Sequence, residues 1–258
     1  MLLVFDVGNT ETTIGLFDRE TIVRHWRVGT DPARTPDEVA SALHALMALQ
    51  GLDRIAIRGA AIGSVVPSMN DALGEGVELL TGRRPLFVDA KSSLPITLDV
   101  LEPLTVGADR IINTLAASRL FKADTIVVDL GTATTYDCIT ADGVFLGGVI
   151  APGIRTSAET LFRRTSKLPA TELAPPSRTI GRRTEDCIRS GVVFGAAEAL
   201  DGIVRRIKRE WPTGAVPLVV ATGGLAPMIA PICETIDRVE PHLTLVGLRL
   251  AWELLAGS

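Results

Sequence analysis

Short apolar runs alternate along this chain with segments in which apolar residues recur at helical spacing. The first run reaches Val7, and a Gly-Asn-Thr turn separates it from a second run, which is the pattern of a β-hairpin. Residues 35–38, Thr-Pro-Asp-Glu, combine a capping Thr, a Pro suited to the first helical position and the Glu of a capping box. They predict a helix that ends near Gly51. The elements expected next are a strand over 55–62, a short helix from Ser68 and a strand over 86–88.

The second half of the chain repeats this plan. A helix from Gly107 leads into a second hairpin that begins at Ile126. The elements expected after it are a strand over 145–150, a long helix over 185–211, a strand over 218–221 and a closing helix over 243–254. Strands that alternate with helices indicate an α/β fold. We predict two closely packed lobes, residues 1–116 and 117–258, with the active site in the cleft between them.

One motif occurs twice, once in each half of the chain. Residues 4–13 and 127–136 align without a gap. The alignment places Asp6 on Asp129, Gly8 on Gly131 and Thr12 on Thr135. Each copy is an apolar run that ends in a carboxylate, followed by a Gly turn with hydroxyl and amide side chains. A single copy is ordinary hairpin chemistry, but two copies favour two halves that bind one phosphate group and its cation. A third glycine turn, residues 221–224, either approaches a nucleotide or simply joins a strand to a helix.

Composition narrows the classes of function. With 258 residues, 47% of them hydrophobic and 22% charged, the chain can bury a core in one large domain or two smaller ones. A net charge of −4 without a segregated basic half gives no reason to expect nucleic acid. The three Cys are far apart, and neither a leader nor a membrane-spanning stretch is recognisable. We therefore expect a soluble cytoplasmic protein without disulfides or a zinc site.

Several common catalytic motifs are absent from the sequence. No Gly-Lys dipeptide occurs, so there is no P-loop, and HRD, DFG, GxSxG and HExxH are missing as well. The three His are scattered, which leaves carboxylates for acid–base work. Asp109 and Arg110 either form local helix and ion-pair contacts or hold the hydroxyl and carboxylate of one small molecule. Thr184 is expected to cap the following helix, in which Gly191 and Gly195 form a small-residue stripe for a contact within or between subunits.

These residues resemble those of the type III pantothenate kinases, members of the acetate and sugar kinase and actin superfamily. The resemblance covers essentially the whole chain and rests on five motifs, at residues 6–10, 107–110, 129–135, 147–153 and 221–224. It implies a duplicated ribonuclease H-like (actin-like ATPase) fold and a homodimer. It also implies ATP-dependent phosphorylation of pantothenate to 4'-phosphopantothenate, the first step of coenzyme A biosynthesis.

The resemblance implies roles for individual residues as well. The ATP phosphates, with Mg²⁺ near Asp6, would be held by Asp6, Val7, Gly8, Asn9, Thr10, Glu11, Thr12 and Thr13, and Thr132 would contact ATP from the other lobe. Asp129 would bind a monovalent cation, potassium or ammonium, and Asp109 would be the proton acceptor. The pantothenate pocket would be lined by Gly107, Ala108, Asp109, Arg110 and Thr184.

Two positions depart from the family pattern. Val100 stands on the substrate side where the family often has a Tyr, so one hydrogen bond to the substrate is missing. Glu11 stands where the family commonly has Asn, and its charge either weakens nucleotide affinity or helps to recruit a cation. Two alternatives stay open: a non-catalytic regulatory protein on the same fold, and a kinase for another small hydroxy acid. The presence of Asp109 with both phosphate turns favours a kinase over a binding protein.

Overall fold

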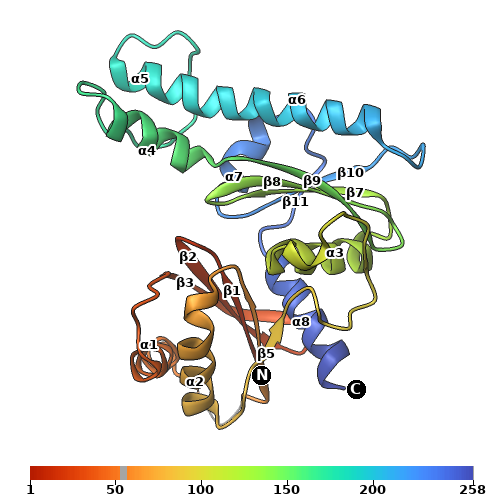
Figure 1. Ribbon diagram of the computed structural model, residues 1–258. Coiled ribbons are helices and arrows are strands. Elements are labelled where there is room, and N and C mark those ends of the chain that lie inside the picture. The colour runs from red at the N-terminus through yellow and green to blue at the C-terminus, as the bar shows by residue number, and fades with distance from the viewer. Residues whose placement is uncertain (53–56, 258) are drawn as a thin grey trace. The chain divides into compact units, whose positions relative to one another are not determined.

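The computed structural model describes residues 1–52 and 57–257 of the chain (Figure 1). Internal contacts group the chain into two units. Unit 1 contains Met1–Ile96, Val100–Ala116 and Leu243–Ser258, and unit 2 contains Thr97–Asp99 and Ala117–His242. This grouping differs from the predicted lobes 1–116 and 117–258 in two places. Thr97–Asp99 belongs to unit 2, and the closing segment from Leu243 packs with the first sheet.

Unit 1 is built on a five-stranded sheet with the strand order β3-β2-β1-β4-β5. The strands are β1 (Leu2–Val7), β2 (Glu11–Asp18), β3 (Thr21–Gly29), β4 (Gly59–Ser64) and β5 (Leu86–Val88). β1 pairs antiparallel with β2 and parallel with β4, which confirms the predicted hairpin. Of the strand predicted over 55–62, residues 55 and 56 lie outside the described residues, and β4 begins at Gly59. β3 was not predicted, because this edge strand is half-buried or exposed throughout and lacks a strong apolar pattern.

The helices of this part of the chain are α1 (Pro36–Ala48), α2 (Asn70–Thr81), α3 (Ala108–Phe121) and α8 (Leu243–Ala256), with short 3-10 turns η2 (Pro67–Met69) and η3 (Pro103–Thr105). The capping box predicted for α1 is present. The N–H of Glu38 donates to Thr35 Oγ1 at 3.3 Å, and the N–H of Thr35 donates to Glu38 Oε2 at 2.8 Å. Two of the N–H groups that the start of the helix leaves without an intrahelical partner are therefore satisfied locally.

Both faces of the first sheet are buried. α1 and α2 cover one face, where Leu3, Phe5 and Val7 join side chains of both helices in one core cluster (Figure 1). α8 packs against β1, β2, β4 and β5, and Leu245 lies 3.1 Å from the place where a Cβ of Gly15 would be. Because successive side chains of a strand point to opposite faces, a strand covered on both sides is mostly apolar, as β1 is from Leu2 to Phe5. The same packing explains why the last helix belongs to unit 1.

Unit 2 repeats the strand order of unit 1. Its six-stranded sheet has the order β11-β10-β7-β8-β9-β6, so that β9-β8-β7-β10-β11 correspond to β3-β2-β1-β4-β5. The strands are β6 (Thr97–Leu98), β7 (Thr125–Leu130), β8 (Ala133–Ile139), β9 (Val144–Pro152), β10 (Leu218–Thr222) and β11 (Arg238–Val239). β6 is an additional edge strand, parallel to β9. The duplicated α/β fold predicted from the repeated motif is thus confirmed.

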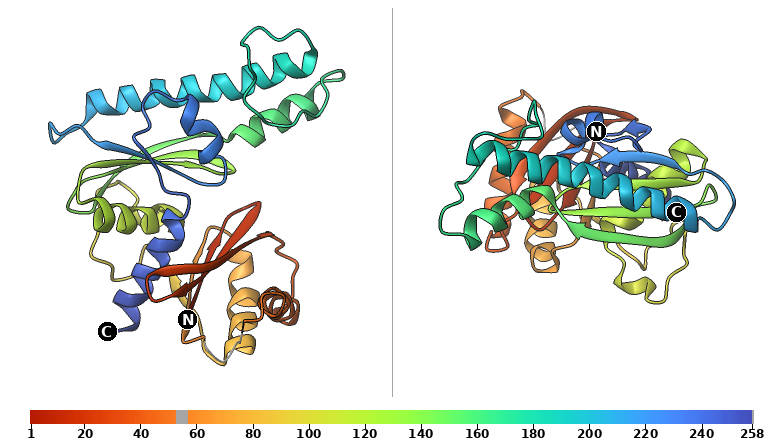
Figure 2. Two further views of the ribbon diagram at one scale, coloured as in Figure 1. Left: turned by 180° about the vertical axis from the view of Figure 1, so that it is seen from behind. Right: turned by 90° about the horizontal axis from the view of Figure 1, so that it is seen from above.

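One uninterrupted helix dominates unit 2 (Figure 2). α5 (Thr184–Arg189) continues through a π-helical segment, η4 (Ser190–Phe194), into α6 (Gly195–Glu210). This confirms the long helix predicted over 185–211. The remaining helices of the unit are α4 (Ile154–Arg164), α7 (Ala226–Ile229) and the 3-10 turn η5 (Ala230–Ile232). α4 was not predicted, because most of its residues are exposed.

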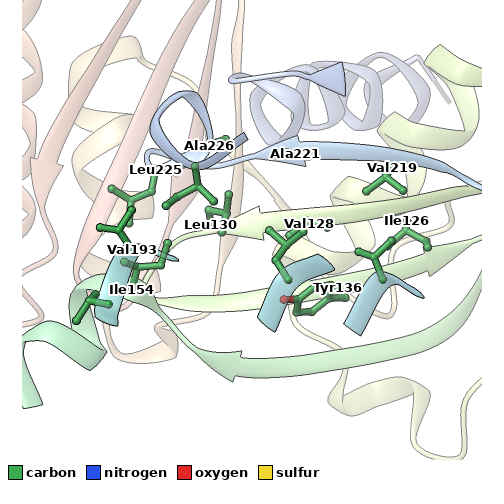
Figure 3. Close-up of a cluster of buried hydrophobic side chains, with 14 of the residues drawn as sticks. Ile126, Val128, Leu130, Tyr136, Ile154, Val193, Val219, Ala221, Leu225 and Ala226 are labelled. Carbon is green, nitrogen blue, oxygen red and sulfur yellow. The ribbon is translucent and has the colours of Figure 1, made fainter. Parts of the chain in front are cut away.

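The core of unit 2 lies between its sheet and this long helix (Figure 3). Ile126, Val128 and Leu130 alternate along β7 and contribute to it, together with Tyr136 of β8 and Val193 of η4. This alternation leaves Asp129, between two core residues, on the opposite face of the strand. In the part of the chain that the structure describes, no helix is long and apolar enough to cross a membrane.

Candidate active site

The first acidic turn joins the carboxyl end of β1 to β2. Asp6 lies opposite Thr13 in the strand pairing. The turn closes with a hydrogen bond from the N–H of Gly8 to the carbonyl oxygen of Glu11, at 3.1 Å. Thr30 follows β3 and donates its hydroxyl to the carbonyl oxygen of Gly8 at 2.7 Å. The turn is therefore held from the neighbouring strand as well as from within.

The predicted nucleotide-binding residues of this turn differ in what they expose. Val7 and Thr12 are buried, at 1% and 4% exposure, so their side chains pack inside the protein beneath the turn. Thr12 Oγ1 lies 3.0 Å from Thr30 Oγ1. Asn9 and Thr10 at the tip are exposed. A phosphate at this turn would therefore meet main-chain N–H groups and the tip side chains.

The second acidic turn joins β7 to β8 in unit 2. Asp129 lies opposite Thr135, and the N–H of Gly131 donates to the carbonyl oxygen of Ala133 at 3.0 Å. Thr132 is exposed at the tip. In the first turn the N–H of Gly8 donates to the carbonyl oxygen three residues later, whereas here the N–H of Gly131 donates to the one two residues later. The second turn is therefore one residue shorter.

The difference in turn length corrects the alignment of the two motifs. By strand register, Thr13 opposite Asp6 corresponds to Thr135 opposite Asp129. The gapless alignment, which placed Thr12 on Thr135, is therefore wrong after the turn. The two turns differ in length because the hydrogen bond that closes each one sets how many residues the loop holds.

The third glycine turn presses against the second acidic turn. β10 runs parallel to β7 with Thr222 opposite Asp129. Gly223 has φ +87°, and a Cβ on it would lie 2.5 Å from Asp129 Oδ1 and 2.8 Å from the main-chain N of Leu130. Only glycine allows both this backbone conformation and this approach. The carboxylate of Asp129 is thereby placed against bare main chain.

Thr132 lies beside the start of α4. Thr156 of this helix donates its hydroxyl to the carbonyl oxygen of Thr132 at 2.8 Å, and Gly153 precedes the first turn of the helix. A helix N-terminus carries a partial positive charge that favours anions. The motif at residues 147–153 thus ends where α4 meets the second acidic turn.

Asp109 stands in the first turn of α3. Its Oδ1 accepts the N–H of Arg110 at 2.9 Å, and a Cβ on Gly107 would lie 2.5 Å from this same oxygen. Burial raises the pKa of Asp109 and outweighs the hydrogen bond and charge of Arg110, which lower it. A carboxylate with a raised pKa is better suited to accept a proton near neutral pH.

Unit 1 brings Asp109 and the first acidic turn to the same end of one sheet. In the parallel pair of β1 and β4, Asp6 lies opposite Gly63. A Cβ on Gly63 would lie 3.8 Å from Cβ of Ala108, and one on Gly107 would lie 3.4 Å from Val65 Cγ1. The first turn of α3 therefore packs on the end of β4, next to the strand that carries Asp6.

The other predicted substrate residues, Thr184 and Val100, belong to different units. Thr184 does not cap its helix: it is the first helical residue, Arg183 occupies the capping position, and no side chain makes a capping hydrogen bond. Thr184 instead lines a mainly apolar cavity of about 850 Å³ between the sheet and helices of unit 2. Val100 is half-buried in unit 1.

Glu11 forms an ion pair beside the first acidic turn. Arg27 of β3 places its Nε 2.5 Å from Glu11 Oε1, and both side chains are about half exposed. Arg27 lies opposite Thr13 in the strand pairing. The negative charge that Glu11 adds near the turn is therefore balanced on the neighbouring strand.

The carboxylates present suit cations that are shared with a phosphate. Among the described residues, no three His, Cys, Asp or Glu come together as a metal-binding group. Mg²⁺ in nucleotide sites commonly uses one or two carboxylates plus phosphate oxygens and water, which the single Asp6 side chain fits. The Asp129 carboxylate lies against the main chain of Gly223 and is the ligand that this turn offers to a cation.

Sequence reasoning did not single out Arg27 or Ser64 at the end of β4. Arg27 reaches Glu11 only through the pairing of β2 with β3, and Ser64 lies opposite Val7 only through that of β1 with β4. The polar alternation of β3 is the one local signal that could have indicated Arg27.

Two kinds of comparison relate the chain to known proteins. The family model described as type III pantothenate kinase matches residues 2–206. A type III pantothenate kinase from Moorella thermoacetica is 44% identical over 255 residues, covering 98% of this chain and 99% of that protein.

Solved structures show similarity of fold. A Campylobacter jejuni protein described as a Baf family transcriptional activator has a TM-score of 0.60 at 16% identity, covering 99% of this chain and 100% of that chain. The activator of 2-hydroxyisocaproyl-CoA dehydratase from Clostridium difficile, with bound ADPNP, has a TM-score of 0.52 at 11% identity, covering 99% and 96%. At these identities the two structures support the fold alone.

Proposed function

The chain belongs to the type III pantothenate kinase family, and we propose that Asp109 accepts the proton as the ATP γ-phosphoryl group passes in line to the primary hydroxyl of pantothenate. The overall reaction, ATP-dependent phosphorylation of pantothenate, belongs to coenzyme A biosynthesis. The observation that carries the mechanism is the Asp109 carboxylate, with its raised pKa, at the same sheet end as the Asp6 turn.

Positioning supplies most of the catalysis in this proposal. Phosphoryl transfer passes through a loose transition state, so the protein mainly aligns the reactants and stabilises the phosphate oxygens. The N–H groups and tip side chains of the Asp6–Thr13 turn hold the ATP phosphates, and Thr132 of the second turn contacts the same nucleotide. Asp109 orients the hydroxyl and takes its proton late in the transfer. Arg110 and Gly107 hold the acceptor substrate beside it.

Two cations complete the charge balance. Asp6 would hold Mg²⁺ together with the phosphates, and Asp129 would hold potassium or ammonium with main-chain oxygens of the Gly223 turn. When bound, these ions supply the positive charge that a P-loop Lys supplies in other kinases. Asp6 and Asp129 orient the ions, and Gly223 keeps the place beside Asp129 free of a side chain.

The experiment is an assay of ADP release by the purified chain with ATP, Mg²⁺ and potassium against pantothenate and a panel of other hydroxy acids. Asp109→Asn should lower turnover more than ~10²-fold, in line with the loss of an acid–base group. In the wild type, activity should fall as the pH drops through the raised pKa of Asp109, because the base must be ionised. The variant should lack this acid limb.

The same variant should fold at least as stably as the wild type at neutral pH. A folded-state pKa above the unfolded value means that the ionised Asp109 costs stability as the pH rises, and Asn removes this charge. Asp71→Asn is the matched control, since Asp71 is also an acid in the first turn of a helix in unit 1. Near-wild-type turnover of Asp109→Asn would reject its role, and turnover of another hydroxy acid in place of pantothenate would reject the substrate.

We further infer a homodimer that acts in the cytoplasm. Gly191 and Gly195 line the apolar cavity of unit 2, and a Cβ on either would meet no atom within 4 Å. Their small size therefore serves no contact within the chain, whereas a second copy packing on this stripe would require it. Phe162 of α4, at 48% exposure, lies on a helix that lines the same cavity. The three free cysteines suit a reducing compartment.

A further inference from the structure

Unit 1 contains a cavity of about 320 Å³ next to Asp109. Its wall includes Ser64 and Val65 at the end of β4, and Gly107 and Ala108 at the start of α3. The loop after β5 closes it with Lys91. Small-molecule sites begin at roughly 300 Å³, so the cavity has the size of a compact ligand.

We propose that this cavity receives the carboxylate-bearing end of the acceptor substrate and that Lys91 is the counter-ion of this carboxylate. The proposal rests on the proposed function, because it takes the acceptor to be a hydroxy acid such as pantothenate. It adds a specificity-determining residue to the site, one that the sequence motifs did not indicate.

The charge of Lys91 is available to a ligand. Its side chain is exposed, and no ion pair involves it among the residues that the structure describes. Asp89 also lines the cavity, but its Oδ1 accepts the N–H of Lys91 at 2.8 Å and lies 3.4 Å from Ser92 Oγ. This carboxylate is thus turned to its own loop. The one positive charge of Lys91, with the Asp89 carboxylate nearby, balances a ligand with one negative charge better than a phosphate with two.

The start of α3 adds to the preference for an anion. Gly107 and Ala108 form part of the wall, and Ala108 is the first residue of this 14-residue helix. The partial positive charge of a helix N-terminus stabilises a carboxylate placed there. Lys91 and the N-terminus of α3 therefore both contribute positive charge to the cavity wall.

The remaining wall suits a short aliphatic chain with polar groups. Val65, Leu104 and Val106 contribute apolar surface. Ser64 Oγ accepts the N–H of Val66 at 3.1 Å, which leaves its hydroxyl hydrogen free to donate to a ligand carbonyl. The wall is thus about half apolar and half polar, which suits a short ligand that carries polar groups at its ends.

The cavity also lies within reach of the proposed base. Gly107 belongs to its wall, and Asp109 Oδ1 lies 2.5 Å from the position that a Cβ of Gly107 would take, so the carboxylate is next to this part of the wall. An acceptor can therefore present its hydroxyl to Asp109 and its opposite end to Lys91. In this arrangement a neutral alcohol loses the contact with Lys91 while keeping the one with Asp109.

The test compares pantothenate with pantothenyl alcohol, in which an uncharged hydroxymethyl group replaces the carboxylate. Lys91→Gln should lower kcat/KM for pantothenate by roughly 10- to 100-fold, the range for a charge-assisted hydrogen bond, mainly through KM. Its kcat/KM for pantothenyl alcohol and its KM for ATP should stay unchanged. Lys91→Arg should retain most of the activity on pantothenate. Lys122→Gln, at another exposed lysine, should change neither substrate.

The outcomes separate this inference from the proposed function. If the wild type phosphorylates pantothenate and Lys91→Gln affects both acceptors equally, or neither, the role of Lys91 is refuted. If the wild type does not phosphorylate pantothenate at all, the proposed function fails and this inference fails with it. Thermal unfolding of the three lysine variants shows whether a loss reflects folding, which is not expected at exposed positions.

Discussion

Replacing Gly223 with Ala tests the geometry of the second acidic turn. A Cβ at this position would lie 2.5 Å from Asp129 Oδ1 and 2.8 Å from the main-chain N of Leu130. The backbone of the turn is anchored by the parallel pairing that sets Thr222 opposite Asp129. Because the carboxylate is the more mobile neighbour, we expect the methyl group to displace it.

The cost of this change has two parts. An L-residue in a left-handed conformation costs about 1–2 kcal/mol, and Gly223 has φ +87°. Over-packing against Asp129 and Leu130 adds about 1–3 kcal/mol. The free energy of unfolding should therefore fall by about 2–5 kcal/mol. If Asp129 holds the cation as proposed, moving its carboxylate by ~1 Å should lower kcat/KM by about 10²-fold and raise the potassium concentration needed for half-maximal activity.

Gly82→Ala is the matched control. Gly82 ends α2 with φ +70°, but a Cβ on it would meet no atom within 4 Å. Only the conformational part of the cost applies, so this variant should lose about 1–2 kcal/mol and keep its activity. Urea unfolding followed by circular dichroism measures both free energies, and ADP release at graded potassium measures the activity.

The comparison gives a clear negative result as well. If Gly223→Ala loses no more stability than Gly82→Ala, and keeps both turnover and potassium dependence, the Asp129 carboxylate does not lie against residue 223. The assignment of a cation to this place would then have no structural basis.

Two further predictions concern the charge near the first turn and the stripe of unit 2. Arg27→Gln should raise KM for ATP up to about fivefold by exposing the charge of Glu11, less at high salt, and adding Glu11→Gln should restore it. Steady-state kinetics of the wild type and these two variants would contradict the pairing if the double variant stayed impaired. Gly195→Arg should yield a folded monomer in light scattering after gel filtration, whereas Gly202→Arg, in the same helix but outside the cavity wall, should remain dimeric. Equal behaviour of the two glycine variants would place the subunit contact elsewhere.

Local signals in the sequence were sufficient for several elements. The capping box of α1 could be predicted from Thr35 and Glu38, because its hydrogen bonds join residues three positions apart. The helix over 184–210 and the two hairpins followed from apolar periodicity and glycine turns. The repeated acid and glycine at the hairpins also indicated the duplicated fold, which the two matching strand orders confirm.

Contacts between distant segments decided the remainder. The offset of one residue between the acidic turns depends on which carbonyl oxygen accepts the glycine N–H that closes each loop, and no local pattern specifies this choice. The placement of α8 in unit 1 depends on its packing against β1, β2, β4 and β5, which lie far away in the sequence.

What the amino-acid order determined by itself is therefore the local chemistry: two acidic turns, an acid in the first turn of α3, and helices with defined starts. Only the folded chain shows which distant residues these groups contact. Arg27 pairs with Glu11, Lys91 lines the cavity near Asp109, and Gly223 lies against Asp129. The physical reason is that hydrogen bonds and side-chain periodicity act within a few residues. Strand pairing and helix packing bring together groups that no short pattern relates.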